Sequence, residues 1–264
     1  MTSDLTEPVS YGLPVGDEVL MLNSYIGQHI ELRYSSRIVC VHCGNKTSKS
    51  FNQGYCYPCF MRLAQCDLCI LKPETCHYAA GTCREPDWGL TFCFQPHVVY
   101  LANSSGIKVG ITRRSQVPTR WIDQGAVQAL PIFEASSRQV SGLAEVALAK
   151  HVSDKTSWQA MLKNHVQTLD LPQLRDELLQ TCADDFAAIR NRFGDDALVP
   201  IADVQPQTIV YPVLIYPAKV KSFNLDKDPV VAGVLQGIKG QYLLLDTGVI
   251  NVRKYTGYDV EVRV

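Results

Sequence analysis

The sequence predicts an α+β fold in which small metal-binding modules join two parts rich in β-structure. Nine of the ten cysteines fall between Cys40 and Cys93, which is typical of metal-binding modules. Two adjacent apolar runs followed by amphipathic segments predict an antiparallel sheet with flanking helices. Short apolar runs separated by glycines near the end predict a small β-barrel or sheet. We therefore divide the chain into four parts, residues 1–38, 39–95, 96–197 and 198–264.

Length and composition indicate a folded, soluble protein. The chain has 264 residues, of which 46% are hydrophobic and 19% charged, and its formal net charge is −1. A chain of this length can bury a sizeable core. Its first residues contain no basic segment followed by an apolar run, as a signal peptide would, and no apolar run approaches the roughly 20 residues that span a bilayer. We expect a cytoplasmic protein without membrane contact.

Charge is distributed unevenly along the chain. Between Ser36 and Arg120 there are ten lysines and arginines and four acidic residues, whereas the remainder carries 15 basic and 22 acidic residues. A basic part balanced by an acidic part is typical of a protein that binds phosphate groups or nucleic acid with one part only. Chance clustering of charges is the alternative interpretation.

The first cysteine cluster consists of two C-x-x-C pairs, CVHC and CYPC, separated by twelve residues. Each pair presents two thiolates about one turn apart, and the loop between the pairs folds back to bring all four together. This spacing is typical of a tetrahedral zinc ribbon. We therefore expect Cys40, Cys43, Cys56 and Cys59 to hold one structural Zn²⁺.

A second cysteine cluster follows directly. It contains Cys66, Cys69, Cys76, His77, Cys83 and Cys93. One zinc ion needs four ligands, so the cluster holds more than a single site requires. A second Zn²⁺ is the favoured occupant, and an iron–sulfur cluster is the alternative because irregular spacing is common at such sites. The favoured ligands are Cys66, Cys69, Cys76 and Cys83, with Cys93 next.

A β-hairpin is predicted directly after the cysteine clusters. The apolar runs Val98–Ala102 and Ile107–Thr112 are joined by Asn-Ser-Ser-Gly, in which Gly106 supplies a residue that tolerates a positive φ. Several polar side chains lie on or just beyond these strands, although a structural hairpin needs none of them. These residues are Tyr100, Lys108, Thr112, Arg113, Arg114 and Arg120.

Helices and one more strand are expected after the hairpin. Apolar periodicity, proline near a helix start and glycine after a helix end set their bounds. The predicted segments are a helix over Pro118–Gln124 ended by Gly125, a strand over Ala126–Phe133, and helices over Ser141–His151, Thr156–His165 and Leu171–Phe193. Cys182 lies inside the last of these without a ligand partner, so we expect a core thiol.

Both ends of the chain are expected to contribute β-structure. Ile30, Leu32 and Tyr34 alternate with polar residues, which predicts a half-buried strand over Gln28–Tyr34 after an irregular arm. From Gln207 onward the apolar runs are short and separated by turn residues. The N-terminal strand has no neighbour of its own, so we expect it to close the C-terminal barrel or sheet.

Five residues have side chains that could together form a site for phosphodiester chemistry, namely Tyr100, Lys108, Arg113, Arg120 and Glu145. Guanidinium groups match phosphate oxygens and stabilise charge that develops during reaction. A carboxylate can hold one Mg²⁺ or Mn²⁺, and a tyrosine or a metal-bound water can supply the attacking group. Glu145 lies among apolar residues of its helix, so its carboxylate faces solvent at the helix edge or enters such a site.

The order of VVY, KVG, Arg120-Trp121 and a later helical glutamate resembles the GIY-YIG nuclease superfamily. The resemblance implies a three-stranded antiparallel sheet flanked by helices, and cleavage of nucleic acid with one divalent metal. By position, Tyr100 matches the tyrosine of GIY, Lys108 and Gly110 match the tyrosine and glycine of YIG, Arg120 the helix arginine and Glu145 the metal-binding glutamate. The late asparagine of the superfamily has no clear counterpart, and Asn164 is the candidate for it. Lysine replaces the second tyrosine and is no base unless its pKa falls well below about 10.4.

Nearly the whole chain is also similar to an uncharacterised bacterial family of cysteine-rich proteins. The shared features include the C-x-x-C pairs, HVVYLANSSGIKVGITR and GIKGQYLLLDTGVINVRKYTGY. This similarity implies the order of the parts and leaves the activity open.

Three functions agree with these residues. The first is a divalent-metal-dependent endonuclease that acts on DNA or RNA. The second is a catalytically inactive, zinc-containing nucleic-acid-binding module, favoured because a lysine in place of a tyrosine improves phosphate binding and impairs catalysis. The third is a protein-interaction scaffold, which is favoured if Arg113, Arg114 and Arg120 are dispersed or buried in structural ion pairs.

Overall fold

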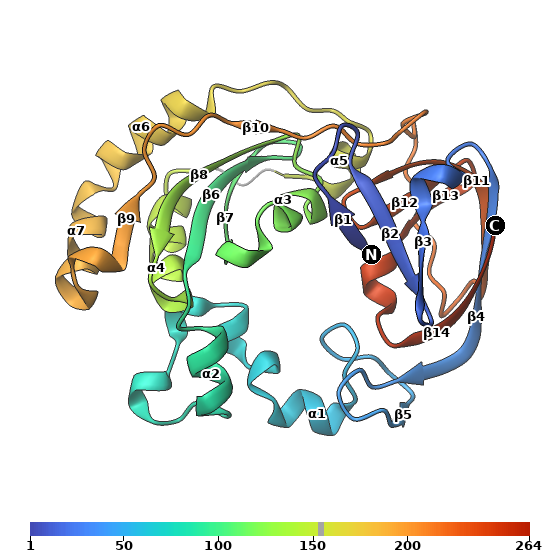
Figure 1. Cartoon of the computed structure of the whole chain (residues 1–264), viewed down its shortest axis with the longest axis horizontal. Coiled ribbons are helices and arrows are strands. Elements are labelled where there is room, and N and C mark those ends of the chain that lie inside the picture. The colour runs from blue at the N-terminus through green and yellow to red at the C-terminus, as the bar shows by residue number, and fades with distance from the viewer. Residues whose placement is uncertain (153–155) are drawn as a thin grey trace.

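The computed structural model describes residues 1–152 and 156–264 and has an α+β architecture. A helix-covered sheet forms one end of the molecule, and a curved, half-barrel sheet forms the other (Figure 1). Helix α3 (Thr119–Asp123) lies between the two sheets, and the cysteine-rich segment (residues 40–95) runs along one side of the molecule. The predicted fold class is confirmed.

The predicted hairpin lies in the middle of the helix-covered sheet. β6 (His97–Asn103) pairs with β7 (Ile107–Arg113) on one side and β8 (Gln128–Ala135) on the other, and both pairings are antiparallel. The short strands β9 (Leu198–Pro200) and β10 (Gln207–Thr208) both pair with β8, so β7 is the outer strand at the opposite edge. The hairpin prediction is confirmed, but Gly106 does not adopt a positive φ, so that detail is wrong.

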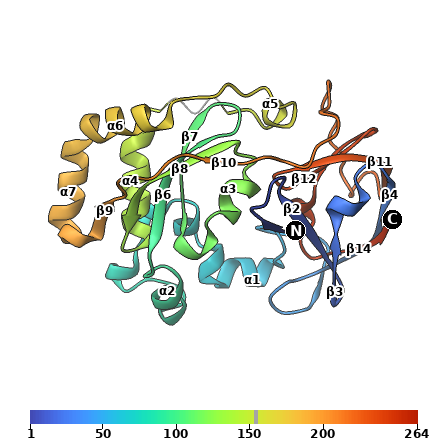
Figure 2. The same ribbon diagram turned by 45° about the horizontal axis from the view of Figure 1, so that its top comes forward.

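Both faces of this sheet are covered, and every residue of β6 is buried. Val99 and Leu101 pack against the helices of one face, whereas Tyr100 and Ala102 point toward α3 and the half-barrel on the other. Figure 2 shows α4, α6 and α7 on one side of the sheet and α3 on the other. A strand buried on both faces requires a continuous apolar run, which explains the sequence of β6.

Helix α4 (Arg138–Ala149) begins at Arg138, three residues before the predicted start at Ser141. The side chain of Ser137 accepts a hydrogen bond from the backbone N–H of Val140 and caps this earlier start. Helix α5 (Trp158–Leu162) is shorter than expected and packs on the half-barrel, where the ring of Trp158 stacks on that of Tyr242 at 5.8 Å.

The single long helix predicted over Leu171–Phe193 is wrong. The chain forms α6 (Leu171–Thr181) and α7 (Ala183–Phe193), separated at Cys182, whose φ of −100° and ψ of 15° are not helical. The Cys182 thiol is buried, so the expected core thiol is confirmed. Among the described residues, no helix is both long enough and apolar enough to cross a membrane.

The predicted N-terminal strand lies inside the C-terminal sheet. β4 (His29–Val39) is longer than predicted and pairs with β11 (Val230–Lys239) on one side and β14 (Tyr258–Arg263) on the other. The remaining strands of the sheet are β5 (Lys46–Thr47), β12 (Tyr242–Leu245) and β13 (Gly248–Asn251). The expectation that the strand completes the C-terminal sheet is confirmed.

The first residues form a sheet of their own, so the expected irregular arm is wrong. Its strands are β1 (Thr2–Asp4), β2 (Ser10–Val15) and β3 (Glu18–Met21). Gly16, with a φ of +60°, makes the tight turn between β2 and β3. This small sheet and the half-barrel border a half-open pocket of about 550 Å³, lined by Leu13, Leu243 and Ile250 among others.

The cysteine-rich segment contains two short helices, α1 (Tyr57–Arg62) and α2 (Pro86–Phe92), connected by 3-10 turns. One of these turns, Pro73–Thr75, packs on α4 at Gly142. A Cβ atom at Gly142 would lie 2.6 Å from the Cβ of Pro73, so only glycine allows this approach. The segment therefore docks on the helix that carries Glu145.

Candidate functional site

The first cysteine cluster lies where β4 ends and α1 begins. Cys40 follows β4, Cys56 precedes α1 and Cys59 lies within α1. The sulfur atoms of Cys40, Cys43, Cys56 and Cys59 all lie within 4.8 Å of one another, and the Cys43 and Cys56 sulfurs are 3.7 Å apart. A tetrahedral zinc with Zn–S bonds of about 2.3 Å separates its sulfurs by about 3.8 Å. These four residues therefore fit a zinc site.

The backbone around Cys40 favours a thiolate. Burial disfavours the charged form, but hydrogen bonds from the backbone of Cys43, Cys56 and His42 outweigh it and lower the pKa of Cys40 to about 6. Only the thiolate of cysteine binds a metal ion, so a lowered pKa makes this residue ready to bind. Burial and contacts with the same neighbouring thiols raise the pKa of Cys59 to about 12, so a bound metal ion is needed to hold both residues as thiolates.

The structure does not bring all members of the second cluster together. Cys66 packs with Cys40, Cys56 and Cys59 of the first cluster. The other four cysteines line one small cavity in the loops around α2. They are Cys69, Cys76, Cys83 and Cys93.

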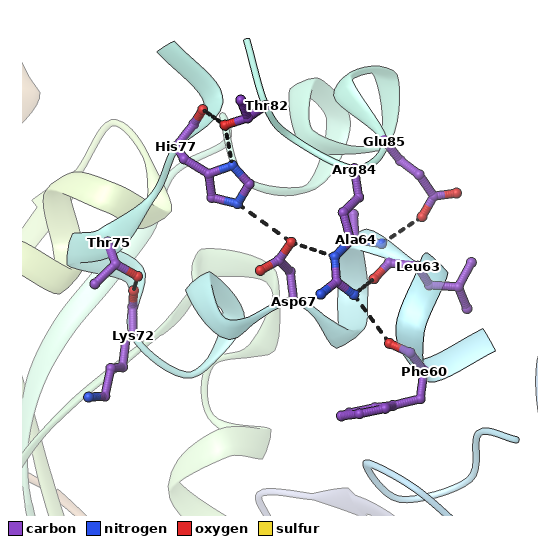
Figure 3. A network of polar contacts seen from close by, with 10 residues as sticks. All are labelled: Phe60, Leu63, Ala64, Asp67, Lys72, Thr75, His77, Thr82, Arg84 and Glu85. Carbon is purple, nitrogen blue, oxygen red and sulfur yellow. Dashed lines mark hydrogen bonds and ion pairs between the residues drawn. The ribbon is translucent and has the colours of Figure 1, made fainter. Parts of the chain in front are cut away.

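His77 and Asp67 also line that cavity, and both belong to the polar network of Figure 3. The Nε2 atom of His77 lies 3.5 Å from the Asp67 carboxylate, and its Nδ1 atom lies 2.8 Å from the Thr82 hydroxyl. Asp67 also pairs with the Arg84 guanidinium at 2.7 Å. Asp67, Cys69 and His77 lie within 4.8 Å of one another, but ion pairing with Arg84 accounts for the Asp67 carboxylate without a metal.

Tyr100 occupies a buried position on β6 and reaches across the outer strand. Its ring lies over Gly110, the residue opposite on β7, where a Cβ would be 2.6 Å from the ring carbon Cζ. Glycine is therefore required for this contact. The Tyr100 hydroxyl donates a hydrogen bond of 3.1 Å to Oε1 of Gln124, at the end of α3.

Arg120 and Glu145 approach Tyr100 from helices on opposite faces of the sheet. Burial raises the pKa of Tyr100 to about 12, the charge of Arg120 opposes this rise, and the charge of Glu145 adds to it. All three side chains are thus close enough for their charges to interact. We call Tyr100, Arg120 and Glu145 the β7-margin site, because Tyr100 spans the outer strand.

The carboxylate of Glu145 is held between charges of both signs. Burial raises its pKa to about 7, Arg138 and Arg120 act to lower it, and Glu74 acts to raise it. Glu74 belongs to the 3-10 turn that docks on α4. The cysteine-rich segment therefore contributes directly to the electrostatics of the β7-margin site.

The other predicted site residues lie elsewhere. Lys108 is opposite Ala102 on β7, on the same face as Tyr100. Arg113 lies over the Phe92 ring at 4.0 Å, toward the cysteine-rich segment, and Arg114 forms an exposed ion pair with Glu134 at 2.8 Å. Asn164, the predicted late asparagine, accepts a hydrogen bond of 2.8 Å from the buried Lys239.

Two residues around the β7-margin site escaped the sequence analysis. Gln124, at the end of the predicted helix, binds the Tyr100 hydroxyl. Arg138 begins α4; its side chain binds the carbonyl oxygen of Ile70, and its charge acts on Glu145. The clue to Gln124 was its position one turn after Arg120. No sequence pattern indicated a role for Arg138, because its contacts form only when the cysteine-rich segment docks on α4.

Comparisons with known proteins place the chain in a family. Searches of curated proteins and of solved structures find no match. A family described as "Protein of unknown function (DUF2797)" matches residues 27–260. The matched region includes both cysteine clusters, the helix-covered sheet and all but the end of the half-barrel. The chain therefore belongs to this DUF2797 family.

Proposed function

We propose that the protein binds nucleic acid and cleaves its phosphodiester backbone at the β7-margin site with one divalent cation. The observation that carries the proposal is the approach of Tyr100, Arg120 and Glu145 from a strand and two helices. A structural core has no need to bring an arginine, a glutamate and a tyrosine together in this way. The GIY-YIG resemblance of the same residues adds to the argument.

The residues of the site suit this chemistry. Arg120 offers a planar fork of donors to phosphate oxygens. Glu145 is the residue that would hold Mg²⁺ or Mn²⁺, since these ions take oxygen ligands and commonly use only one or two carboxylates. When bound, the cation would stabilise developing negative charge and activate a water. Burial raises the pKa of Glu145, and a bound cation would favour the charged carboxylate and lower that pKa again.

The cysteine-rich segment offers several exposed cations to the rest of the nucleic acid. Lys46, Lys49, Arg62 and Lys72 are all exposed. The first three flank the zinc-fitting cysteines, and Lys72 directly precedes the turn that docks beside Glu145. Contacts from these cations to phosphates would be independent of sequence.

A second candidate is binding without cleavage. It is favoured by Tyr100, whose side chain is fully buried and whose pKa is raised, so that its hydroxyl is a poor nucleophile or base. Lys108 also stands where the resemblance implies a second tyrosine. This candidate keeps the phosphate contacts of Arg120 and omits the chemistry.

A cleavage assay separates the two candidates. The protein would be incubated with single-stranded and double-stranded DNA and RNA, with Mg²⁺, with Mn²⁺ or with a chelator. We expect metal-dependent cleavage that Glu145→Gln abolishes, while the matched change at the exposed Glu177 of α6, Glu177→Gln, leaves it unchanged. Cleavage that survives Glu145→Gln would contradict the role of Glu145.

Binding is measured on the same variants by fluorescence anisotropy. Affinity should fall steeply with salt through counterion release, and Arg120→Gln should weaken it. Salt-dependent binding without any cleavage would establish the second candidate. No binding to any of these nucleic acids at low salt would overturn both.

A further inference from the structure

Four cysteines that are scattered in the sequence converge on one cavity. Cys69 lies in a 3-10 turn, Cys76 follows the turn that docks on α4, and Cys83 and Cys93 lie before and after α2. The cavity leaves only about 20 Å³ for a water-sized molecule. It can therefore take an ion or an inorganic cluster bonded to its walls, and it excludes an organic ligand.

The four cysteines are free, and all of them line this one cavity. Cys69 lies near Cys76, Cys83 and Cys93, and Cys93 lies near Cys76 and Cys83. Several free cysteines gathered at one cavity are typical of a metal or metal-cluster site.

Their spacing differs from that of the first cluster. The sulfurs of Cys40, Cys43, Cys56 and Cys59 all lie within 4.8 Å of one another, but in the part of the chain that the structure describes no three of the cavity sulfurs do. One zinc would require separations of about 3.8 Å. An iron–sulfur cluster places several irons and bridging sulfides between its thiolates, so its ligands stand farther apart.

The surroundings of the cavity suit an anionic cluster. The carbonyl oxygen of Cys93 accepts a hydrogen bond of 2.8 Å from the backbone N–H of Arg138. The guanidinium groups of Arg138 and Arg113 both interact with the charge of Cys93. Trp88 and Phe94 line the cavity and limit the access of water. Nearby cations and a dry shell are the means by which proteins stabilise iron–sulfur clusters.

We propose that Cys69, Cys76, Cys83 and Cys93 hold an iron–sulfur cluster, and that Cys66 and His77 are not its ligands. The cluster would fix the loops around α2 and thereby hold Arg138 and Glu74 beside Glu145. This assignment does not depend on nucleic-acid binding or cleavage, because it concerns a different set of residues and a different measurement.

The test is the metal content of the full chain purified without oxygen. We expect about one zinc per chain, together with about two or four irons and as many acid-labile sulfides, and a broad visible absorption that bleaches on reduction. About two zincs per chain, with no iron and no visible absorption, would overturn the proposal.

Variants test the ligand set. Cys76→Ser and Cys93→Ser should each lose iron, sulfide and visible colour and retain the zinc, which reports that the first cluster is still folded. Cys66→Ser and His77→Gln should retain the iron. Loss of iron from Cys66→Ser with retention in Cys93→Ser would overturn the assignment. If the serine variants do not fold, the metal content and the spectrum of the unaltered protein still decide the question.

Discussion

The two cysteine clusters lie in one segment of 54 residues, from Cys40 to Cys93, yet they differ in construction. The first uses two C-x-x-C pairs, and its sulfurs lie at the separations that a single zinc requires. The second collects four single cysteines around a helix, and its sulfurs stand farther apart. Two local motifs bring the first four cysteines together, whereas the turns around α2 bring together the cysteines of the second cluster. The two sites should therefore respond differently to the same disturbance.

The largest expected effect comes from the first cluster. Cys56→Ser removes one thiolate from four, so the chain should lose its zinc and more than about 4 kcal/mol of unfolding free energy, as for other structural metal sites. Metal analysis and urea denaturation would measure both. Cys182→Ser, at a buried thiol outside either cluster, is the control and should retain all metals. Full zinc content in Cys56→Ser would contradict the four-cysteine site.

The next effect concerns Glu145, which is linked by charge to Arg138 beside the second cluster. Its pKa in the folded chain is about 7, above its ordinary value of 4.5. The folded state therefore holds a proton that the unfolded state releases, and this stabilisation is full below pH 4.5 and lost as the pH rises through 7. The shifted pKa of Glu145 can change the free energy of unfolding by at most about 3 kcal/mol.

Thermal unfolding with a chelator of Mg²⁺ measures this dependence. When the pH rises from 5 to 8, the unaltered protein should lose about 1–3 kcal/mol more unfolding free energy than Glu145→Gln loses. Adding Mg²⁺ at pH 8 should restore part of the loss if the cation binds Glu145. Parallel pH profiles of the two proteins would show that Glu145 is not the titrating group.

A smaller effect is expected where the segment docks on α4. Gly142→Ala places a Cβ against Pro73, which should cost about 1–3 kcal/mol by overpacking. The disturbance should be confined to the second cluster, so hydrogen exchange should rise over residues 66–95 and remain unchanged over residues 40–60. Ala144→Gly, on the same helix, is the control for helix propensity. An equal rise in hydrogen exchange over residues 40–60 and 66–95 would mean that the two clusters unfold as one cooperative unit.

The smallest effect belongs to the network of Figure 3. Asp67→Asn removes the charge that pairs with Arg84 and should cost about 1 kcal/mol, because both side chains are partly exposed. The metal content should not change, since Asp67 is engaged by Arg84 and His77. A loss of zinc or iron in this variant would instead make Asp67 a ligand.

Local patterns predicted much of this structure. The alternation of Ile30, Leu32 and Tyr34 predicted β4 and its place in the C-terminal sheet, and the two C-x-x-C pairs predicted the zinc-fitting site. The break at Cys182 was missed because periodic apolar residues continue across it. The sheet formed by β1, β2 and β3 was missed because strands of three to six residues carry little periodicity.

The composition of the second cluster could not be predicted from spacing. Cys66 and Cys69 form a C-x-x-C pair in the sequence, yet Cys66 packs with the first cluster and Cys69 faces the other cavity. The two cysteines of one C-x-x-C motif therefore point to different clusters, and their directions are set by the two 3-10 turns within residues 64–70. The contact of Arg138 with Ile70 likewise depends on docking rather than on any local pattern.

The position of β4 also has a consequence for how the chain folds. Two of its partners, β11 and β14, lie about 200 residues farther along the sequence, whereas the two-residue strand β5 follows it closely and pairs only with its end. Pairings between such distant segments form slowly, because a long loop must close first. During synthesis the zinc ribbon and the helix-covered sheet can therefore form while most of β4 still lacks its partners β11 and β14. Its charged residues, among them Glu31, Arg33 and Arg37, would oppose aggregation during that interval.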